Sequence, residues 1–111
     1  MVEYRDDDLD GVYGALSNTS RRELVERLAI SPARVTDIAG SFAMSLAGVS
    51  KHIRVLEDAG LIQRQVQGRE HLISFEPGPL LGAAAWIAGY RRFWEDRLDL
   101  LDRRLRESRK K

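Results

Sequence analysis

Cysteine is absent from the 111 residues of this chain. Its absence excludes disulfides, thiolate-bound metals and thiol-based redox sensing. Apolar runs are also short, and none approaches the roughly 20 residues needed to cross a bilayer. The first ten residues carry five carboxylates against a single arginine, and they contain no apolar segment of the kind found in secretory signals. We therefore expect a cytoplasmic protein that does not bind membranes.

Signatures of the common enzyme classes are missing as well. The chain has no nucleophile elbow, no phosphate-binding glycine loop and no zinc-hydrolase motif. Its only two histidines are His52 and His71, and we expect each of them to pack or to form hydrogen bonds rather than to bind a metal. The sequence thus predicts a protein that is not an enzyme and that holds no cofactor.

Size and charge restrict the protein further. We expect residues 1–111 to form a single domain, and a domain this small buries only about two-thirds of the surface of its unfolded chain. A second copy of the chain would bury more. The net charge is only +1, but acidic residues gather at the start of the chain and basic residues in its last six positions. This segregation permits a local basic face on a molecule that is nearly neutral overall.

Hydrophobic periodicity predicts five helices and one β-hairpin. Apolar residues recur at helical spacing over 8–17, from 18 or 20 to 30, over 35–40, over 46–58 and from about 79 to 106. Asn18 or Ser20 is suited to cap the second helix, with segment 20–23 matching a capping box. Ser45 is suited to begin the fourth helix and Gly60 to end it. Alternation over 61–66 and 71–75, with Gly68 available for the turn, predicts two strands.

This order of elements is mainly α with a two-stranded β-hairpin wing, which is typical of a winged helix-turn-helix fold. Residues 35–75 would form the helix-turn-helix and the wing, and residues 107–111 a flexible basic tail.

The exposed face of the helix over 46–58 is the first candidate site. Val49, Ile53 and Leu56 must face the core, which turns small and basic residues outward. Short side chains allow a helix to approach the base edges of double-stranded DNA, and cations on the wing can contact phosphates. The predicted DNA-binding residues are Ser45, Ala47, Gly48, Ser50, Lys51, His52, Arg54, Arg64, Gln67 and Arg69.

An apolar stripe along the last predicted helix is the second candidate site. At 1.5 Å per residue this helix would be about 40 Å long, and one small domain does not easily cover so long a face. We therefore predict a homodimer in which the helices over 9–17 and 79–106 pair with those of a second copy. The predicted interface residues are Leu9, Val12, Tyr13, Leu16, Trp86, Tyr90, Phe93, Trp94, Leu98 and Leu101.

Four segments carry a family resemblance: NTSRR at 18–22, VSKHIRVLEDAGLI at 49–62, GR at 68–69 and WIAGYRRFW at 86–94. They resemble the ArsR/SmtB family of bacterial winged-helix regulators, in a branch that lacks metal-sensing cysteines. The resemblance covers nearly all of residues 9–105. It implies a dimer built from the first and last helices, and a helix starting near Ser45 that reads the major groove. It also implies repression of transcription, often of the protein's own operon.

Departures from the family pattern leave two alternatives open. Where many family members carry a cysteine pair, this chain has Arg34, Val35 and Thr36, and no histidine lies on its last helix. A metal-responsive repressor remains an alternative, since carboxylates on the last helix offer oxygen ligands; these are Glu95, Asp96, Asp99 and Asp102. The other alternative is a winged helix that binds a protein partner through the aromatic stripe. The sequence does not identify the signal that would release the protein from DNA; the candidates are a small apolar ligand between the terminal helices, a metal on the acidic helix face, or protein concentration alone.

Overall fold

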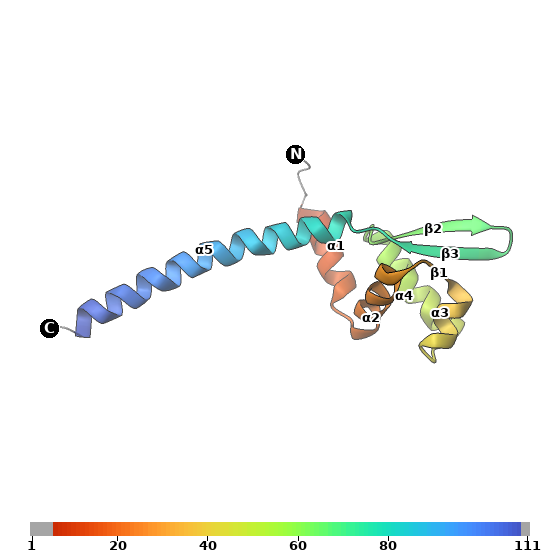
Figure 1. Ribbon diagram of the computed structural model, residues 1–111, viewed down its shortest axis with the longest axis horizontal. Coiled ribbons are helices and arrows are strands. Elements are labelled where there is room, and N and C mark those ends of the chain that lie inside the picture. Colours follow the sequence, from red (N-terminus) through yellow and green to blue (C-terminus); the bar gives the residue numbers. More distant parts are fainter. Residues whose placement is uncertain (1–5, 110–111) are drawn as a thin grey trace.

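The computed structural model describes residues 6–109 as a winged helix-turn-helix with one very long helix (Figure 1). Its elements are α1 (Asp6–Leu16), α2 (Thr19–Ile30), β1 (Ala33–Arg34), α3 (Val35–Ser41), α4 (Leu46–Asp58), β2 (Ile62–Gln67), β3 (Glu70–Phe75) and α5 (Gly78–Arg109). Helices α1 to α4 form a compact body, and the β2–β3 hairpin and α5 project from it in opposite directions. The predicted fold class is confirmed.

The sheet has one strand more than the sequence predicted. Its order is β1-β3-β2 with antiparallel pairing throughout, and the register sets Ala33 opposite Ile73 and Ile62 opposite Phe75. Strand β1 has only two residues, too few to show a periodicity of their own. Strand β1 forms because it can pair with the free edge of β3. This pairing connects the start of α3 to the wing.

The core lies between the helical body and the base of the hairpin. Helix α2 buries Leu24, Val25 and Leu28, and α4 buries Val49, Ile53 and Leu56, as predicted. Helix α1 buries Leu9 and Val12 in the same core, with exposed fractions of 7% and 1%. The sequence predicts these two residues in a dimer interface. They are instead packed within the protomer, because α1 must cover the apolar faces of α2 and α4 before it can contact a second chain.

Three helix ends follow their predicted capping signals, and one predicted signal is wrong. The Ser45 hydroxyl accepts a hydrogen bond from the Gly48 amide at 3.1 Å, and Gly60 has the left-handed φ of 76° expected just beyond α4. Asn18 caps α2, since its side-chain oxygen accepts a hydrogen bond from the Arg21 amide at 3.1 Å. The capping box expected at 20–23 is wrong, because Ser20 already lies inside the helix.

Helix α5 dominates the shape of the molecule. Its 32 residues correspond to a length of about 48 Å. The molecule measures 75 × 34 × 22 Å, with a radius of gyration of 19.8 Å, whereas a compact chain of this size has about 13 Å. The helix continues through Arg109, so residues 107–109, expected in a flexible tail, are helical; residues 110–111 lie outside the described part. Within residues 6–109 no helix, α5 included, is apolar and long enough to cross a membrane.

Candidate nucleic-acid interface

The turn between α3 and α4 fixes the orientation of the second helix. The Met44 amide donates to the Ala39 carbonyl oxygen at 3.2 Å, and the Phe42 amide donates to that of Ile38 at 3.1 Å. Phe42 and Met44 pack against the core, and Ala43 between them adopts a left-handed φ of 51°. The turn is therefore anchored on both sides of Ala43, and α4 leaves it in a defined direction.

Helix α4 presents the outward face that the sequence predicted. Ser45, Ala47, Ser50, Lys51 and Arg54 are exposed, whereas Gly48 and His52 are half-buried. Gly48 faces back toward the cap, since a Cβ atom there would lie 3.1 Å from the Ser45 hydroxyl oxygen. The exposed set combines two cations with short side chains, a composition suited to phosphates and base edges.

His52 lies at the edge of this face and points toward the junction of α1 and α2. Its Nδ1 atom is 3.4 Å from Nη1 of Arg21. Burial, followed by the positive charges of Arg21 and Lys51, lowers the pKa of His52 below its ordinary value of 6.5. The imidazole is therefore neutral near pH 7. His52 thus has a partner within the protomer, at the α1–α2 junction, whereas the sequence predicts it among the DNA-contacting residues.

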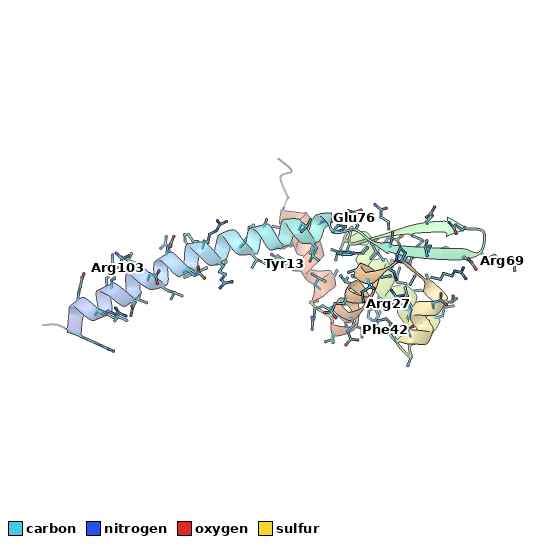
Figure 2. The ribbon with its side chains drawn as sticks, in the orientation of Figure 1. Tyr13, Arg27, Phe42, Arg69, Glu76 and Arg103 are labelled. Atoms are coloured by element: carbon cyan, nitrogen blue, oxygen red, sulfur yellow. The ribbon has the colours of Figure 1, made fainter. Side chains whose placement is uncertain are left out.

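The wing residues fall into two kinds. Gln67 and Arg69 are exposed, and Arg69 lies at the far end of the hairpin (Figure 2). Arg64 is half-buried, and its guanidinium donates to the Glu57 carboxylate and to Nδ1 of His71. The sequence suggested a free cation at position 64, but the structure places it inside the junction between α4 and the wing.

A groove between the helix-turn-helix and the wing joins the two predicted parts of the site. Its volume is about 380 Å³. The groove is lined by Arg34, Val35, Thr36, Leu46, Ser50, Arg64, Arg69, Glu70 and His71. It brings Ser50 of α4 and Arg69 of the wing to one concave surface.

Six lining residues were not predicted; these are Arg34, Val35, Thr36, Leu46, Glu70 and His71. Arg34 forms an ion pair with Glu70 across the β1–β3 pairing, at 3.2 Å, and Thr36 and Leu46 are exposed at the starts of α3 and α4. Leu46 is one helical turn before Ser50, so this spacing was a usable signal for sharing a face. Arg34 had no such signal, since only the two-residue strand β1 brings it to the wing.

The exposed apolar face of α5 lies on the opposite side of the body. Trp86 and Tyr90 stack with ring centroids 5.0 Å apart, and Trp86 meets Tyr13 of α1 edge-on at 6.4 Å. Leu16 is half-buried against the core. The remaining predicted interface residues are about half exposed in the single chain; these are Trp86, Tyr90, Phe93, Trp94, Leu98 and Leu101.

The carboxylates of α5 do not gather into a metal site. Across residues 6–109, no three side chains of the His, Asp and Glu types form a group able to hold a metal ion. Glu95 instead pairs with Arg91 at 2.9 Å, and Asp102 pairs with Arg106 at 3.1 Å. Both are pairs of oppositely charged side chains one turn apart on a solvent-facing helix.

The fold, the anchored turn and the groove that α4 shares with the wing define a winged helix-turn-helix protein with a surface suited to DNA. Comparisons with known proteins agree on the family. Residues 18–64 match the sequence model of the bacterial regulatory protein, arsR family. Over 94 residues the chain is 34% identical to the HTH-type transcriptional regulator Rv2034 of Mycobacterium tuberculosis (strain ATCC 25618 / H37Rv), an alignment that covers 85% of this chain and 83% of that protein.

Solved structures extend the comparison. The crystal structure of the ArsR family transcriptional regulator RHA00566 is 37% identical, with a TM-score of 0.77 over 86% of this chain and 97% of that one. The solution structure of Mb0332 from Mycobacterium bovis, a homodimeric winged helix-turn-helix DNA-binding domain, shares the fold at 23% identity, with a TM-score of 0.64 over 80% of this chain and 90% of that one. The chain belongs to the ArsR family of bacterial regulatory proteins. It is thus a DNA-binding transcriptional regulator and not an enzyme.

Proposed function

We propose that the protein is a homodimeric repressor in the cytoplasm that binds a partly palindromic operator. The observation that carries this proposal is the groove in which Ser50 of α4 and Arg69 of the wing face the same space. In this arrangement α4 enters the major groove, with Lys51 and Arg54 at its sides, and the wing tip contacts the adjacent backbone. A bound dimer then blocks transcription of the genes that follow, the protein's own operon among them.

Dimerisation is supported by the shape of the chain. Helix α5 projects from the body with ten large apolar side chains exposed along it, and a second copy is the partner that could cover so long a face. The Mycobacterium bovis relative with the same fold is itself described as homodimeric. Two symmetric recognition helices favour operator half-sites about 34–36 Å apart, or a multiple of that distance.

The chain has no cysteine, so its release from DNA would not depend on a thiolate-bound metal. A repressor that senses a metal through carboxylates of α5 is the less favoured form of the proposal, because Glu95 and Asp102 already pair with arginines of the same helix.

DNA binding is tested with purified protein and the promoter DNA upstream of its own gene, using a panel of duplexes altered one base pair at a time. Arg69→Ala should weaken binding by a similar factor on every duplex and reduce the slope of log affinity against log salt by about 0.9 per lost phosphate contact. Ser50→Ala should instead change the order of preference among the duplexes, since a base contact contributes about 1–3 kcal/mol of discrimination.

Equal effects of both substitutions on every duplex would contradict this division of roles. A wild-type chain that shifts no promoter duplex at low salt, and that is monomeric in sizing chromatography, would favour the rival function of a protein-interaction module, for which the exposed aromatic face of α5 is the supporting observation.

A further inference from the structure

Arg64 forms three side-chain contacts at the junction between α4 and the wing. Its Nε atom donates to Oε2 of Glu57 at 3.2 Å and its Nη2 atom to Oε1 at 3.3 Å, while Nη1 donates to Nδ1 of His71 at 3.0 Å. The ion pair is largely shielded, with 26% of the Arg64 side chain and 34% of the Glu57 side chain exposed. A two-point contact of this kind fixes direction as well as distance.

The three residues come from three different elements. Glu57 lies in the last turn of α4, Arg64 on β2 and His71 on β3. One guanidinium therefore connects the recognition helix to both strands of the hairpin. The covalent link between α4 and β2 is only three residues long and contains Gly60 at a left-handed φ of 76°. The Leu61 amide donates to the Leu56 carbonyl oxygen at 3.0 Å, so the backbone fixes the base of the wing to α4, and Arg64 adds a side-chain contact farther along β2.

The distal part of the hairpin is also tied to β1 by the ion pair between Arg34 and Glu70, but both side chains are more than half exposed, and such a pair contributes at most about 1 kcal/mol. Strand β1 pairs with β3 only at Ile73 and Leu72, toward the base, whereas Arg69 lies at the far end (Figures 1 and 2). A small rotation at the base would therefore displace Arg69 by a larger distance. Arg64 lies opposite Ile73, level with the β1 pairing, and His71 lies one residue nearer the tip than Leu72. The contacts of Arg64 with Glu57 and His71 therefore join α4 to both strands and limit such a rotation.

We propose that Arg64 is a positioning residue for DNA binding. It holds the wing against the recognition helix so that Arg69 meets the backbone at a fixed distance from Ser50, and it does not itself bind a phosphate. This inference rests on the proposed function. It assigns to Glu57 and His71, neither of which was predicted to matter for DNA binding, the role of anchoring Arg64.

If Arg64 instead contacted a phosphate, Glu57→Gln would change the DNA affinity in the opposite direction. Glu57→Gln would then release a cation toward DNA, raise the affinity and steepen the salt dependence. A positioning role predicts that Glu57→Gln lowers the affinity and leaves the salt slope unchanged. Arg64→Lys separates the roles again, because lysine keeps the charge for a phosphate but cannot form the two-point contact with Glu57.

The experiment measures operator affinity at several salt concentrations for full-length Glu57→Gln, Arg64→Lys and the double variant. Circular dichroism gives the folded fraction of each variant, and each affinity is calculated for the concentration of folded protein. Each single substitution should weaken binding between about 3-fold and 30-fold, and the double variant should be no weaker than the worse single one, since both act on one network. Arg69→Ala is the comparison for a lost phosphate contact, which lowers the salt slope.

Glu95→Gln is the matched control, because it removes the same charge from an exposed ion pair on α5, and it should leave the affinity unchanged. Tighter binding by Glu57→Gln, a lower salt slope in Arg64→Lys, or unchanged affinity in both would overturn the inference. Hydrogen exchange without DNA separates it from the proposed function: faster exchange of the β2 and β3 amides in Glu57→Gln supports the positioning role even if no duplex is bound, and unchanged exchange contradicts it.

Discussion

At the scale of single residues, two arginines at the α1–α2 junction hold the end of α1. Arg21 donates through Nε to the Ala15 carbonyl oxygen at 2.6 Å and through Nη2 to that of Gly14 at 3.2 Å, and Arg22 donates to that of Leu16 at 2.7 Å. The carbonyl groups of a last helical turn lack partners within the helix, and cations near them are stabilising. The segment 18–22 that carries part of the family resemblance is thus structural: it caps the start of α2 and the end of α1.

His52 lies next to this cap and makes stability depend on pH. Its pKa is lowered by burial and then by the charges of Arg21 and Lys51, so between that lowered pKa and 6.5 the unfolded chain binds more protons than the folded one. The free energy of unfolding therefore rises with pH in this window, and stability is lost as the pH falls through it. His52→Asn, which keeps an acceptor for Arg21, should lose less stability than the wild type between about pH 7.5 and about pH 5.5.

Urea unfolding at the two pH values measures this difference directly. Carboxylates elsewhere contribute to both proteins, so the comparison uses the change in each protein between the two pH values and not the stabilities themselves. An equal loss in wild type and variant would mean that His52 has no part in the pH dependence.

At the scale of elements, the turn into α4 contains the one described non-glycine residue with a positive φ, Ala43. The left-handed conformation costs a residue with a Cβ atom about 1–2 kcal/mol, while glycine adds about 0.4–1 kcal/mol of unfolded-state entropy. Ala43→Gly should therefore stabilise the protein by roughly 0.5–1 kcal/mol in chemical denaturation. The same substitution at Ala88, exposed inside α5, should destabilise it by about 1 kcal/mol. Two changes of the same sign would show that the backbone conformation at Ala43 is not the cause.

Features that depend on neighbouring residues within one element could be predicted from the sequence, whereas contacts between elements could not. Ser45 and Gly60 were placed correctly because a cap depends on a few neighbouring residues, and Ile53 because helical periodicity is local. Arg64 and Arg34 look like free cations in the sequence. Their partners, Glu57 and Glu70, are brought to them only by the packing of the wing on α4 and by the pairing of β1 with β3.

The candidate site divides in the same way. The outward face of α4 followed from the burial of its other face, whereas the groove that joins it to the wing required the tertiary structure. Leu9 was predicted in the dimer interface but packs in the core of its own protomer. An apolar stripe indicates that this face of a helix will be buried, but it does not indicate which surface will cover the face.

At the scale of the whole molecule, the apolar stripe of α5 has a regular period. Ile87, Tyr90 and Trp94 are followed by Leu98, Leu101 and Leu105, so the spacing of three, four and four residues repeats after eleven. Eleven residues in three turns is 3.67 residues per turn, close to the 3.6 of a straight helix. The stripe therefore stays on one side of α5 along most of its length, and a second copy of the helix can follow it with little supercoiling.

This geometry gives the test of the dimer a matched control on the same helix. Leu98 is 59% exposed within the stripe. Ala88 is also exposed but lies on the opposite side, because it is two residues before Tyr90 and two residues correspond to a rotation of about 200°. Leu98→Asp places a carboxylate in the proposed apolar interface, where an unpaired charge costs several kcal/mol, while Ala88→Asp leaves it in water. Sedimentation at micromolar concentration should give the mass of two 12.6 kDa chains for the wild type and for Ala88→Asp, but of one chain for Leu98→Asp. The monomeric variant should also bind a two-half-site operator more weakly than the wild type, since each half-site then binds independently. If Leu98→Asp remained dimeric, or if both variants dissociated alike, the stripe would not be the face through which two copies meet.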